Sequence, residues 1–176
     1  LYQRSMASIE RVMDVLQTEN AIGYAGRPLP VRDVRGELVF DDLRFAYAPD
    51  ARPALDGVSL AIGAGETVAF VGSTGSGKST LTKLLLRLYE AEHGSIRLDG
   101  VPIDEIALQD LRRAIGYVAQ DSFITDGTVA ENIAYGMRDA PREKIVAAAQ
   151  AAEAHEFIER LPQGYDTQVG ERGMKL

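Results

Sequence analysis

The stretch from Gly72 to Ser79 constrains the fold of this chain more than any other feature. It reads Gly-Ser-Thr-Gly-Ser-Gly-Lys-Ser, which satisfies the pattern G-x-x-x-x-G-K-[ST] of a phosphate-binding loop. Residues 67–71 before it are nearly all apolar and β-prone, which is typical of a strand buried on both faces of a parallel or mixed sheet. Residues 78–89 after it carry leucines at helical spacing. The sequence therefore predicts a strand, a phosphate loop and a helix in direct succession.

The chemistry of such a loop depends on its backbone. Successive N–H groups curl around phosphate oxygens, glycines keep side chains away from the anion, and the following helix points its positive end at the same place. We expect Lys78 to neutralise the β- and γ-phosphates, Ser79 to give its hydroxyl to Mg²⁺ and Thr80 to add a phosphate contact. The predicted ligand is a nucleoside triphosphate with Mg²⁺. Its expected contacts here are Gly72, Ser73, Thr74, Gly75, Ser76, Gly77, Lys78, Ser79 and Thr80.

Two other interpretations of the loop leave some of its residues unexplained. A glycine-rich turn that merely connects a strand to a helix does not require Lys78 and Ser79 in register. A dinucleotide-binding turn requires a third glycine three residues after Gly77, where Thr80 stands instead.

The charge of the chain argues against one class of partner. The sequence has 19 Lys and Arg against 26 Asp and Glu, a net charge of -7, whereas nucleic-acid binders cluster basic residues. We therefore expect no nucleic-acid partner. Within residues 63–89, however, the basic residues Lys78, Lys83 and Arg87 outnumber the single acidic residue, Glu66, so the net charge around the loop is positive.

The composition also excludes two structural features. The absence of cysteine excludes disulfides, and no run approaches the roughly 18 apolar residues of a membrane span.

Composition divides the chain into three parts. Residues 1–20 predict an amphipathic helix, which either packs on its own domain or continues from a missing transmembrane domain. Residues 21–36 contain glycine and proline without a period and predict a linker. A domain then occupies residues 37–176. The apolar face of the helix comprises Met6, Ile9, Val12 or Met13, and Leu16.

The remaining periodicity predicts an α/β fold with an antiparallel β portion in front. Strands are expected at residues 37–40, 43–47, 58–62, 94–98 and 115–118, with an Asp-Gly turn after residue 98. Helices are expected at residues 108–114, 128–135 and 141–160.

Several stretches around the loop resemble the nucleotide-binding domain of an ATP-binding cassette (ABC) transporter, of the exporter type with a fused transmembrane domain. The resemblance covers essentially all 176 residues. It is carried by residues 55–60, 63–69, 94–100, 115–120, 128–133, 164–167 and 169–173. It implies a P-loop NTPase core of the ABC ATPase type with an antiparallel β subdomain in front and the C-terminal part missing. It also implies ATP as the nucleotide.

The resemblance assigns two further nucleotide contacts. Tyr47 matches the position where the family stacks an aromatic ring on adenine, and its alternative role is that of a buried strand residue. Gln120 matches the glutamine that touches Mg²⁺ or its water, and its alternative is an exposed surface residue. The expected metal site is therefore Ser79 with Gln120.

The resemblance also implies contacts with a membrane-spanning partner. Coupling helices of the transmembrane domain are expected near Phe123, Ile124, Glu131 and Asn132. The spacing of Thr128 and Glu131 is equally that of a helix capping box, and the two roles are compatible. Glu171 and Arg172 match a loop that communicates with the transmembrane region, with a solvated ion pair as the alternative. His93 and His155 match no catalytic position and are expected at the surface.

The catalytic residues of the family are expected beyond Leu176. The chain ends where the Leu-Ser-Gly-Gly-Gln signature would begin, and the catalytic glutamate and switch histidine lie further downstream in the family. No catalytic residue is thus assigned within the chain, which we expect to be unable to hydrolyse ATP by itself. It should also expose apolar surface and an unpaired sheet edge, because the missing strands belong to the central sheet.

For the parent protein, the resemblance implies an exporter ATPase in the cell (inner) membrane, with this domain on the cytoplasmic face. It would pair with a second nucleotide-binding domain, identical or different, and move a lipid-like or amphipathic substrate. Two other classes remain: a P-loop kinase acting on a small metabolite, and a module that only senses nucleotide.

Overall fold

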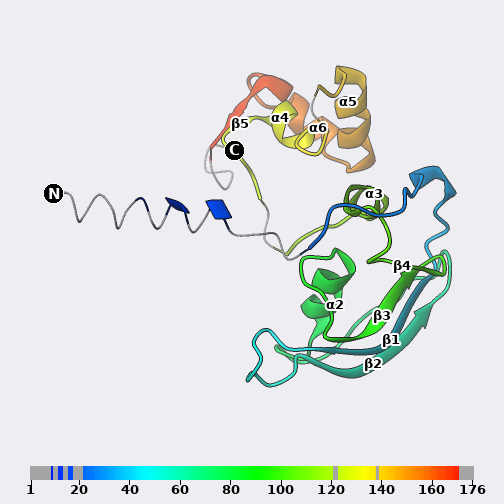
Figure 1. Cartoon of the computed structure of the whole chain (residues 1–176). Coiled ribbons are helices and arrows are strands. Elements are labelled where there is room, and N and C mark those ends of the chain that lie inside the picture. Colours follow the sequence, from blue (N-terminus) through cyan, green and yellow to red (C-terminus); the bar gives the residue numbers. More distant parts are fainter. Residues whose placement is uncertain are drawn as a thin grey trace. The chain divides into compact units, whose positions relative to one another are not determined.

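The computed structural model describes residues 9, 12, 13, 16, 17, 22–120, 123–137 and 139–170. It divides into two units, Leu1–Tyr117 and Val118–Leu176, each described here by itself (Figure 1). The helix expected over residues 1–20 is described only at five positions, which are helical. Glu171 and Arg172 lie outside the described residues. Among the helices that are described, none has the length and apolar character needed to cross a membrane.

The first unit is built on a four-stranded antiparallel sheet in the order β2-β1-β3-β4. The strands are β1 (Leu38–Phe45), β2 (Leu55–Ile62), β3 (His93–Leu98) and β4 (Val101–Pro102). The two strand segments expected at 37–40 and 43–47 are thus one strand, with an irregularity after Phe40. The Asp-Gly turn is confirmed, because Asp99 (φ 51°) and Gly100 (φ 81°) both adopt the left-handed conformation between β3 and β4.

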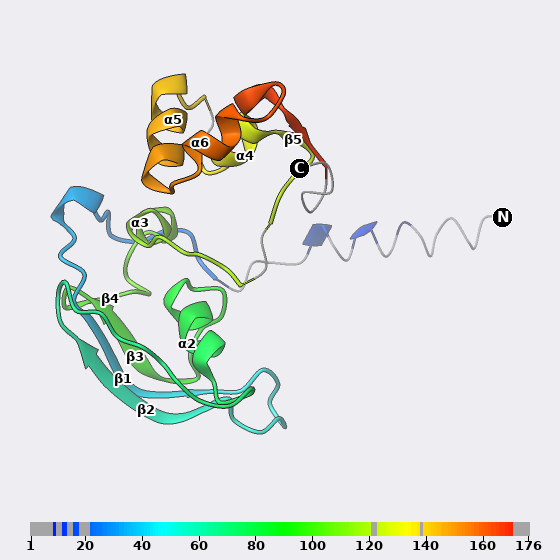
Figure 2. The ribbon, with the colours of Figure 1, turned by 180° about the vertical axis from the view of Figure 1, so that it is seen from behind.

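Two helices cover one side of this sheet, as the opposite views in Figure 1 and Figure 2 show. Helix α2 (Lys78–Leu85) follows the phosphate loop, and α3 (Leu108–Ala114) has the bounds that the sequence predicts. Their apolar faces meet the buried face of the sheet, and this packing fixes the helix that begins at the loop. The core consists of Phe40, Leu43, Phe45, Leu55, Leu81, Leu84, Ile96, Leu98, Ile103, Ile106 and Leu111.

The segment expected to be a linker is bonded to this unit. Arg27 forms an isolated parallel bridge with Ile106. A Cβ atom on Gly26 would lie 2.5 Å from the carbonyl carbon of Ile106, so only glycine permits this approach. Further along, the Asp99 carboxylate accepts hydrogen bonds from the N–H groups of Arg35 (2.7 Å) and Glu37 (2.9 Å). The short 3₁₀ helix η1 (Val31–Asp33) lies in the sequence between the Arg27 bridge and the residues bonded to Asp99.

Two predicted strands are wrong. Residues 67–71 and 115–118 form no strand, and Val71 and Val118 are 90% and 95% exposed. The physical reason is that a strand exists only through hydrogen bonds to a neighbour, and neither run pairs with any described residue. Their exposed side chains, with Phe70 and Tyr117, give the apolar surface that we expect for this chain.

The second unit is a small cluster of short helices with a two-stranded ribbon. Its elements are β5 (Gly127–Thr128), α4 (Val129–Ile133), α5 (Arg142–Ala151), α6 (His155–Glu159), η2 (Gly164–Asp166) and β6 (Gln168–Val169). The helix expected over 141–160 is therefore two helices, separated where Glu153 adopts φ 55°. The buried residues of this unit are Val129, Ile145, Ala149, Ile158, Tyr165 and Val169.

Candidate nucleotide-binding site

The phosphate loop is closed by its own lysine. The Nζ of Lys78 donates hydrogen bonds to the carbonyl oxygens of Gly72 and Ser73, both at 2.8 Å, and to Ser76 Oγ at 3.2 Å. The side chain thus reaches back over the loop from the first turn of α2. The ammonium group therefore lies among the loop residues.

Gly77 fixes the loop against the start of β2. Its φ is +91°, and an added Cβ would lie 2.6 Å from the Ala54 carbonyl oxygen and 2.7 Å from Leu55 Cδ2. No other amino acid fits both the conformation and the space. The requirement for glycine here comes from tertiary packing as well as from the need for an open phosphate cradle.

Several backbone N–H groups lie at the N-terminal end of α2, next to the loop. The N–H groups of Thr80 and Leu81 both donate to the Gly77 carbonyl. Within the described part of the chain, the N–H groups of Gly75, Lys78 and Ser79 have no backbone acceptor. Such unpaired N–H groups at a helix N-terminus, together with the positive end of the helix dipole, form an anion-binding arrangement.

A depression of about 560 Å³ opens beside the loop and includes Gly75 among its lining residues. The loop residues Ser73, Thr74, Gly75 and Ser76 line one part of it, and residues 52–54 with Asp56 line the other. The exposed Arg52 therefore lies beside the loop, a position that its neighbours in the sequence do not reveal.

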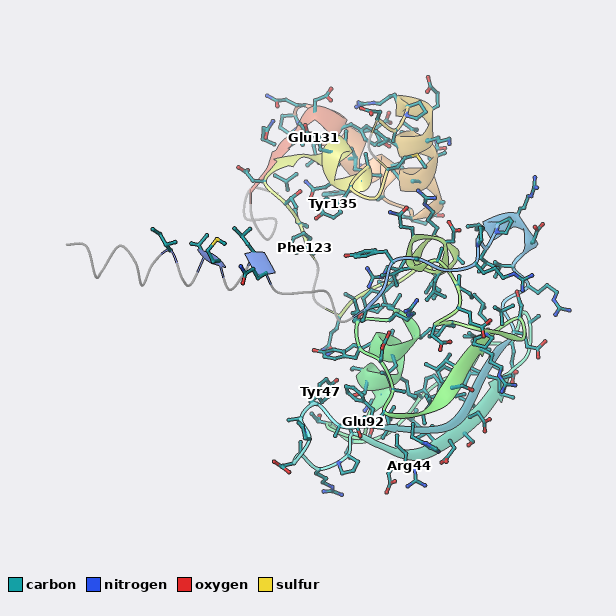
Figure 3. The ribbon with its side chains drawn as sticks, in the orientation of Figure 1. Arg44, Tyr47, Glu92, Phe123, Glu131 and Tyr135 are labelled. Atoms are coloured by element: carbon teal, nitrogen blue, oxygen red, sulfur yellow. The ribbon has the colours of Figure 1, made fainter. Side chains whose placement is uncertain are left out.

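Tyr47 lies just beyond the end of β1 and is 48% exposed, so its alternative as a buried strand residue is wrong. Its hydroxyl is 3.1 Å from Thr80 Oγ1 and 3.5 Å from Lys83 Nζ. Thr80 is only 5% exposed. Tyr47 therefore lies beside α2, the helix that follows the phosphate loop (Figure 3).

The two expected Mg²⁺ ligands belong to different units of the structure. Ser79 is exposed in the first unit, and Gln120 is exposed in the second. Among the described residues, no group of three His, Cys, Asp or Glu side chains is arranged to hold a metal ion. An Mg²⁺ ion that accompanies a nucleotide needs fewer protein ligands, because the phosphates and water supply the others. One hydroxyl and one amide oxygen fit that chemistry, and the pairing stays a prediction.

The expected partner contacts lie on the second unit. Phe123 is 78% exposed, and its ring centroid is 5.9 Å from that of Tyr135, which is 69% exposed (Figure 3). Ile124 packs against the core of this unit. Two of the four expected contacts, Phe123 and Glu131, are therefore open to a partner.

Glu131 and Asn132 also have structural roles. The capping box is confirmed: Glu131 N–H donates to Thr128 Oγ1 at 3.1 Å, and Thr128 N–H donates to the Glu131 carboxylate at 2.7 Å. The Asn132 amide accepts from the N–H and Oγ1 of Thr125 and donates to the carbonyl oxygens of Thr125 and Thr128. Asn132 thus holds the segment before α4.

The two histidines differ in their surroundings. His93 is exposed, as expected, with its Nε2 3.1 Å from the Asp42 carboxylate. His155 is only partly at the surface: its side chain is 25% exposed, its Nε2 lies 3.6 Å from the exposed Glu159 carboxylate, and its Nδ1 lies 2.8 Å from the hydroxyl of the buried Tyr165. Tyr165 provides an interior partner for the ring, which the sequence spacing does not reveal.

Comparison with known proteins decides the family. The family model described as ABC transporter matches residues 55–176. The chain belongs to the ABC transporter family. This confirms the resemblance found in the sequence, and the mixed α/β fold class with an antiparallel sheet is confirmed with it.

Individual ABC proteins match nearly the whole chain. An ATP-dependent lipid A-core flippase from Chromobacterium violaceum is 48% identical over 174 residues, 99% of this chain and 30% of the flippase. The heavy metal tolerance factor 1 of Caenorhabditis elegans is 42% identical over 174 residues, 99% of this chain and 22% of that protein.

A solved ABC transporter structure agrees in fold. The structure of a bacterial Atm1-family ABC exporter with ATP bound superposes with a TM-score of 0.88 at 40% identity, covering 99% of this chain and 30% of the exporter chain. The chain thus spans less than a third of each of these ABC relatives. Membership of the family implies ATP as the nucleotide.

Proposed function

We propose that this chain is the ATP-binding part of an ABC exporter, in which ATP binding and hydrolysis drive a lipid-like or amphipathic substrate across a membrane. The observation that carries the proposal is the loop itself: Lys78 Nζ reaches back over the loop, the N–H groups of Gly75, Lys78 and Ser79 have no backbone acceptor among the described residues, and loop residues 73–76 line an open depression. Matching relatives named as a lipid A-core flippase and as a multidrug export ATP-binding/permease protein support the exporter assignment.

In this proposal, the phosphates of ATP occupy the cradle formed by residues 72–80. Lys78 exchanges its carbonyl acceptors in the loop for the β- and γ-phosphates, and the free N–H groups donate to phosphate oxygens. Tyr47 stacks on the adenine, and Arg52 faces the phosphates from across the depression. Bound Mg²⁺, held by Ser79 and Gln120, would neutralise charge that develops on the phosphates during transfer.

The proposal extends to partners and location. A second nucleotide-binding domain would complete the ATP site, and coupling helices would contact the surface near Phe123, Ile124, Glu131 and Asn132. Residues 1–20 would continue from the transmembrane domain, residues 21–36 would link it to the ATPase domain, and this domain would face the cytoplasm beneath the cell membrane.

We further propose that residues 1–176 do not hydrolyse ATP by themselves. The sequence contains no Leu-Ser-Gly-Gly-Gln signature, and no catalytic glutamate or switch histidine is assigned within it. Hydrolysis needs a base and a positioned water in addition to charge stabilisation at the γ-phosphate. A P-loop kinase would need a cluster of arginines over the phosphates, whereas Arg52 is the one arginine among the residues that line the depression.

Calorimetric titration of the 176-residue chain with Mg-ATP tests the proposal. We expect binding that Lys78→Ala weakens by at least tenfold, because hydrogen bonds to charged groups contribute about 1.5–3 kcal/mol. The matched control is Lys144→Ala, which removes an exposed lysine of α5 and should leave the affinity unchanged. Equal affinities of the wild type and Lys78→Ala would overturn the assignment of the loop. Phosphate release above the Lys78→Ala background would overturn the proposed inactivity.

A further inference from the structure

Glu92 holds the chain just before Tyr47 through two hydrogen bonds. The chain leaves the sheet after β1, so strand pairing does not hold Tyr47 itself. The Glu92 carboxylate accepts a hydrogen bond from the Ala46 N–H at 3.3 Å, and the Glu92 N–H donates to the Arg44 carbonyl at 3.1 Å. These three labelled neighbours, Arg44, Tyr47 and Glu92, appear at the same end of the sheet in Figure 3. Glu92 thus holds the chain on both sides of Phe45.

The side chain of Tyr47 contacts two residues of α2. Its hydroxyl pairs with Thr80 Oγ1 at 3.1 Å, and Lys83 Nζ lies 5.2 Å from its ring centroid. The rings of Phe45 and Tyr89 lie edge-on to it, with centroids 5.0 and 5.3 Å away. An exposed tyrosine without such contacts would sample several rotamers. Here the ring is confined while its remaining surface stays open.

The Thr80 hydroxyl lies in the first turn of the helix whose N-terminus forms the phosphate cradle. An aromatic surface and an anion site are therefore attached to one rigid element, α2, at a fixed separation. A ligand with a planar base at one end and phosphates at the other matches this arrangement. Ordering the ring in advance removes part of the entropy lost on binding.

We infer that Thr80 and Glu92 are positioning residues that hold Tyr47 as a preformed platform for the base of the nucleotide. The inference rests on the proposed function and deepens it, since neither residue need touch the base. It also gives the Thr80 hydroxyl a different role from the phosphate contact that the sequence predicts. The two roles make opposite predictions for a phosphate ligand that has no base.

The test compares Mg-ATP with inorganic tripolyphosphate, each titrated into the 176-residue chain. Thr80→Val removes the hydroxyl at nearly constant volume, and Thr80→Ser keeps it. We expect Thr80→Val to lower the ratio of ATP affinity to tripolyphosphate affinity roughly three- to tenfold, the range of one hydrogen bond. Thr80→Ser should restore the ratio. Adding Tyr47→Phe to Thr80→Val should cause little further loss, because both remove the bond at 3.1 Å and only the long 3.5 Å contact with Lys83 is lost in addition.

Glu92 provides a second, exposed position for the same test. Glu92→Ala should lower the ratio about twofold, since a solvent-exposed hydrogen bond contributes less. Glu92→Gln should keep the wild-type ratio, because its amide oxygen still accepts from the Ala46 N–H. Unfolding temperatures of all variants check that the comparison is made between folded chains.

A ligand-free measurement decides the positioning independently. In NMR spectra without nucleotide, Thr80→Val should shift the ring signals of Tyr47, and Thr80→Ser should not. Equal losses for ATP and tripolyphosphate would overturn the inference in favour of a phosphate contact. Unchanged Tyr47 signals in Thr80→Val would also overturn it. If the wild type binds neither ligand, the proposed function fails, and the Tyr47 signals still decide whether Thr80 positions the ring.

Discussion

Replacing Gly77 by alanine tests whether contact with β2 shapes the phosphate loop. The φ of Gly77 is +91°, a conformation that costs a residue with a Cβ about 1–2 kcal/mol. The new Cβ would also lie 2.6 Å from the Ala54 carbonyl oxygen and 2.7 Å from Leu55 Cδ2. Relieving this overlap requires the backbone to move, at about 1–3 kcal/mol. We expect Gly77→Ala to lower the free energy of unfolding of the first unit by about 2–5 kcal/mol.

Gly75 provides a matched control two residues earlier. Its φ is +85°, but an added Cβ would meet no described atom within 4 Å. Gly75→Ala should therefore lose only the conformational term of about 1–2 kcal/mol. Amide hydrogen exchange in β1 and β2, which belong to the same unit as the loop, measures both free energies. Equal losses in the two variants would refute the argument that packing against β2 requires glycine at position 77.

Two further predictions concern the first unit. Leu84→Ala, at a side chain only 1% exposed, should destabilise the unit by about 2–5 kcal/mol in urea denaturation, whereas Leu88→Ala, at 48% exposure, should cost less than about 1 kcal/mol. Burial alone would raise the pKa of Asp99, but hydrogen bonds from the N–H groups of Arg35 and Glu37 outweigh it and lower this pKa. The stabilisation is thus complete above about pH 4 and lost as the pH falls through the lower folded-state pKa. Protection of the Arg35 and Glu37 amides, measured relative to their intrinsic exchange rates at each pH, should fall only in that acidic range, and Asp99→Asn should abolish this pH dependence; an unchanged acid profile in Asp99→Asn would contradict this assignment.

Features encoded by local residues could be predicted from the sequence. Helix α3 has its predicted bounds because its apolar spacing and the packing of Leu108 and Leu111 agree. The turn at Asp99 and Gly100 was predictable because few residue pairs adopt two consecutive positive φ angles. The phosphate loop is local for the same reason, since its glycines and Lys78 are contiguous.

Features that depend on distant neighbours could not be predicted in this way. Residues 67–71 have strand composition, but a strand also needs a partner. The break between α5 and α6 contains no proline or glycine, so no helix-breaking residue predicts it from the sequence. The pairing of Tyr47 with Thr80 and that of His155 with Tyr165 join residues whose closeness follows only from the fold.

The most direct test of the ATP site is the response of individual backbone amides to Mg-ATP. Two-dimensional NMR of the 176-residue chain should show the largest shifts at the N–H groups of Gly75, Lys78 and Ser79, which have no backbone acceptor within the described chain. The amide of Lys144, on the exposed surface of α5, serves as the internal reference and should not move. Saturable shifts at the loop amides would support the account. Saturable shifts confined to other residues, with the loop amides unchanged, would contradict it.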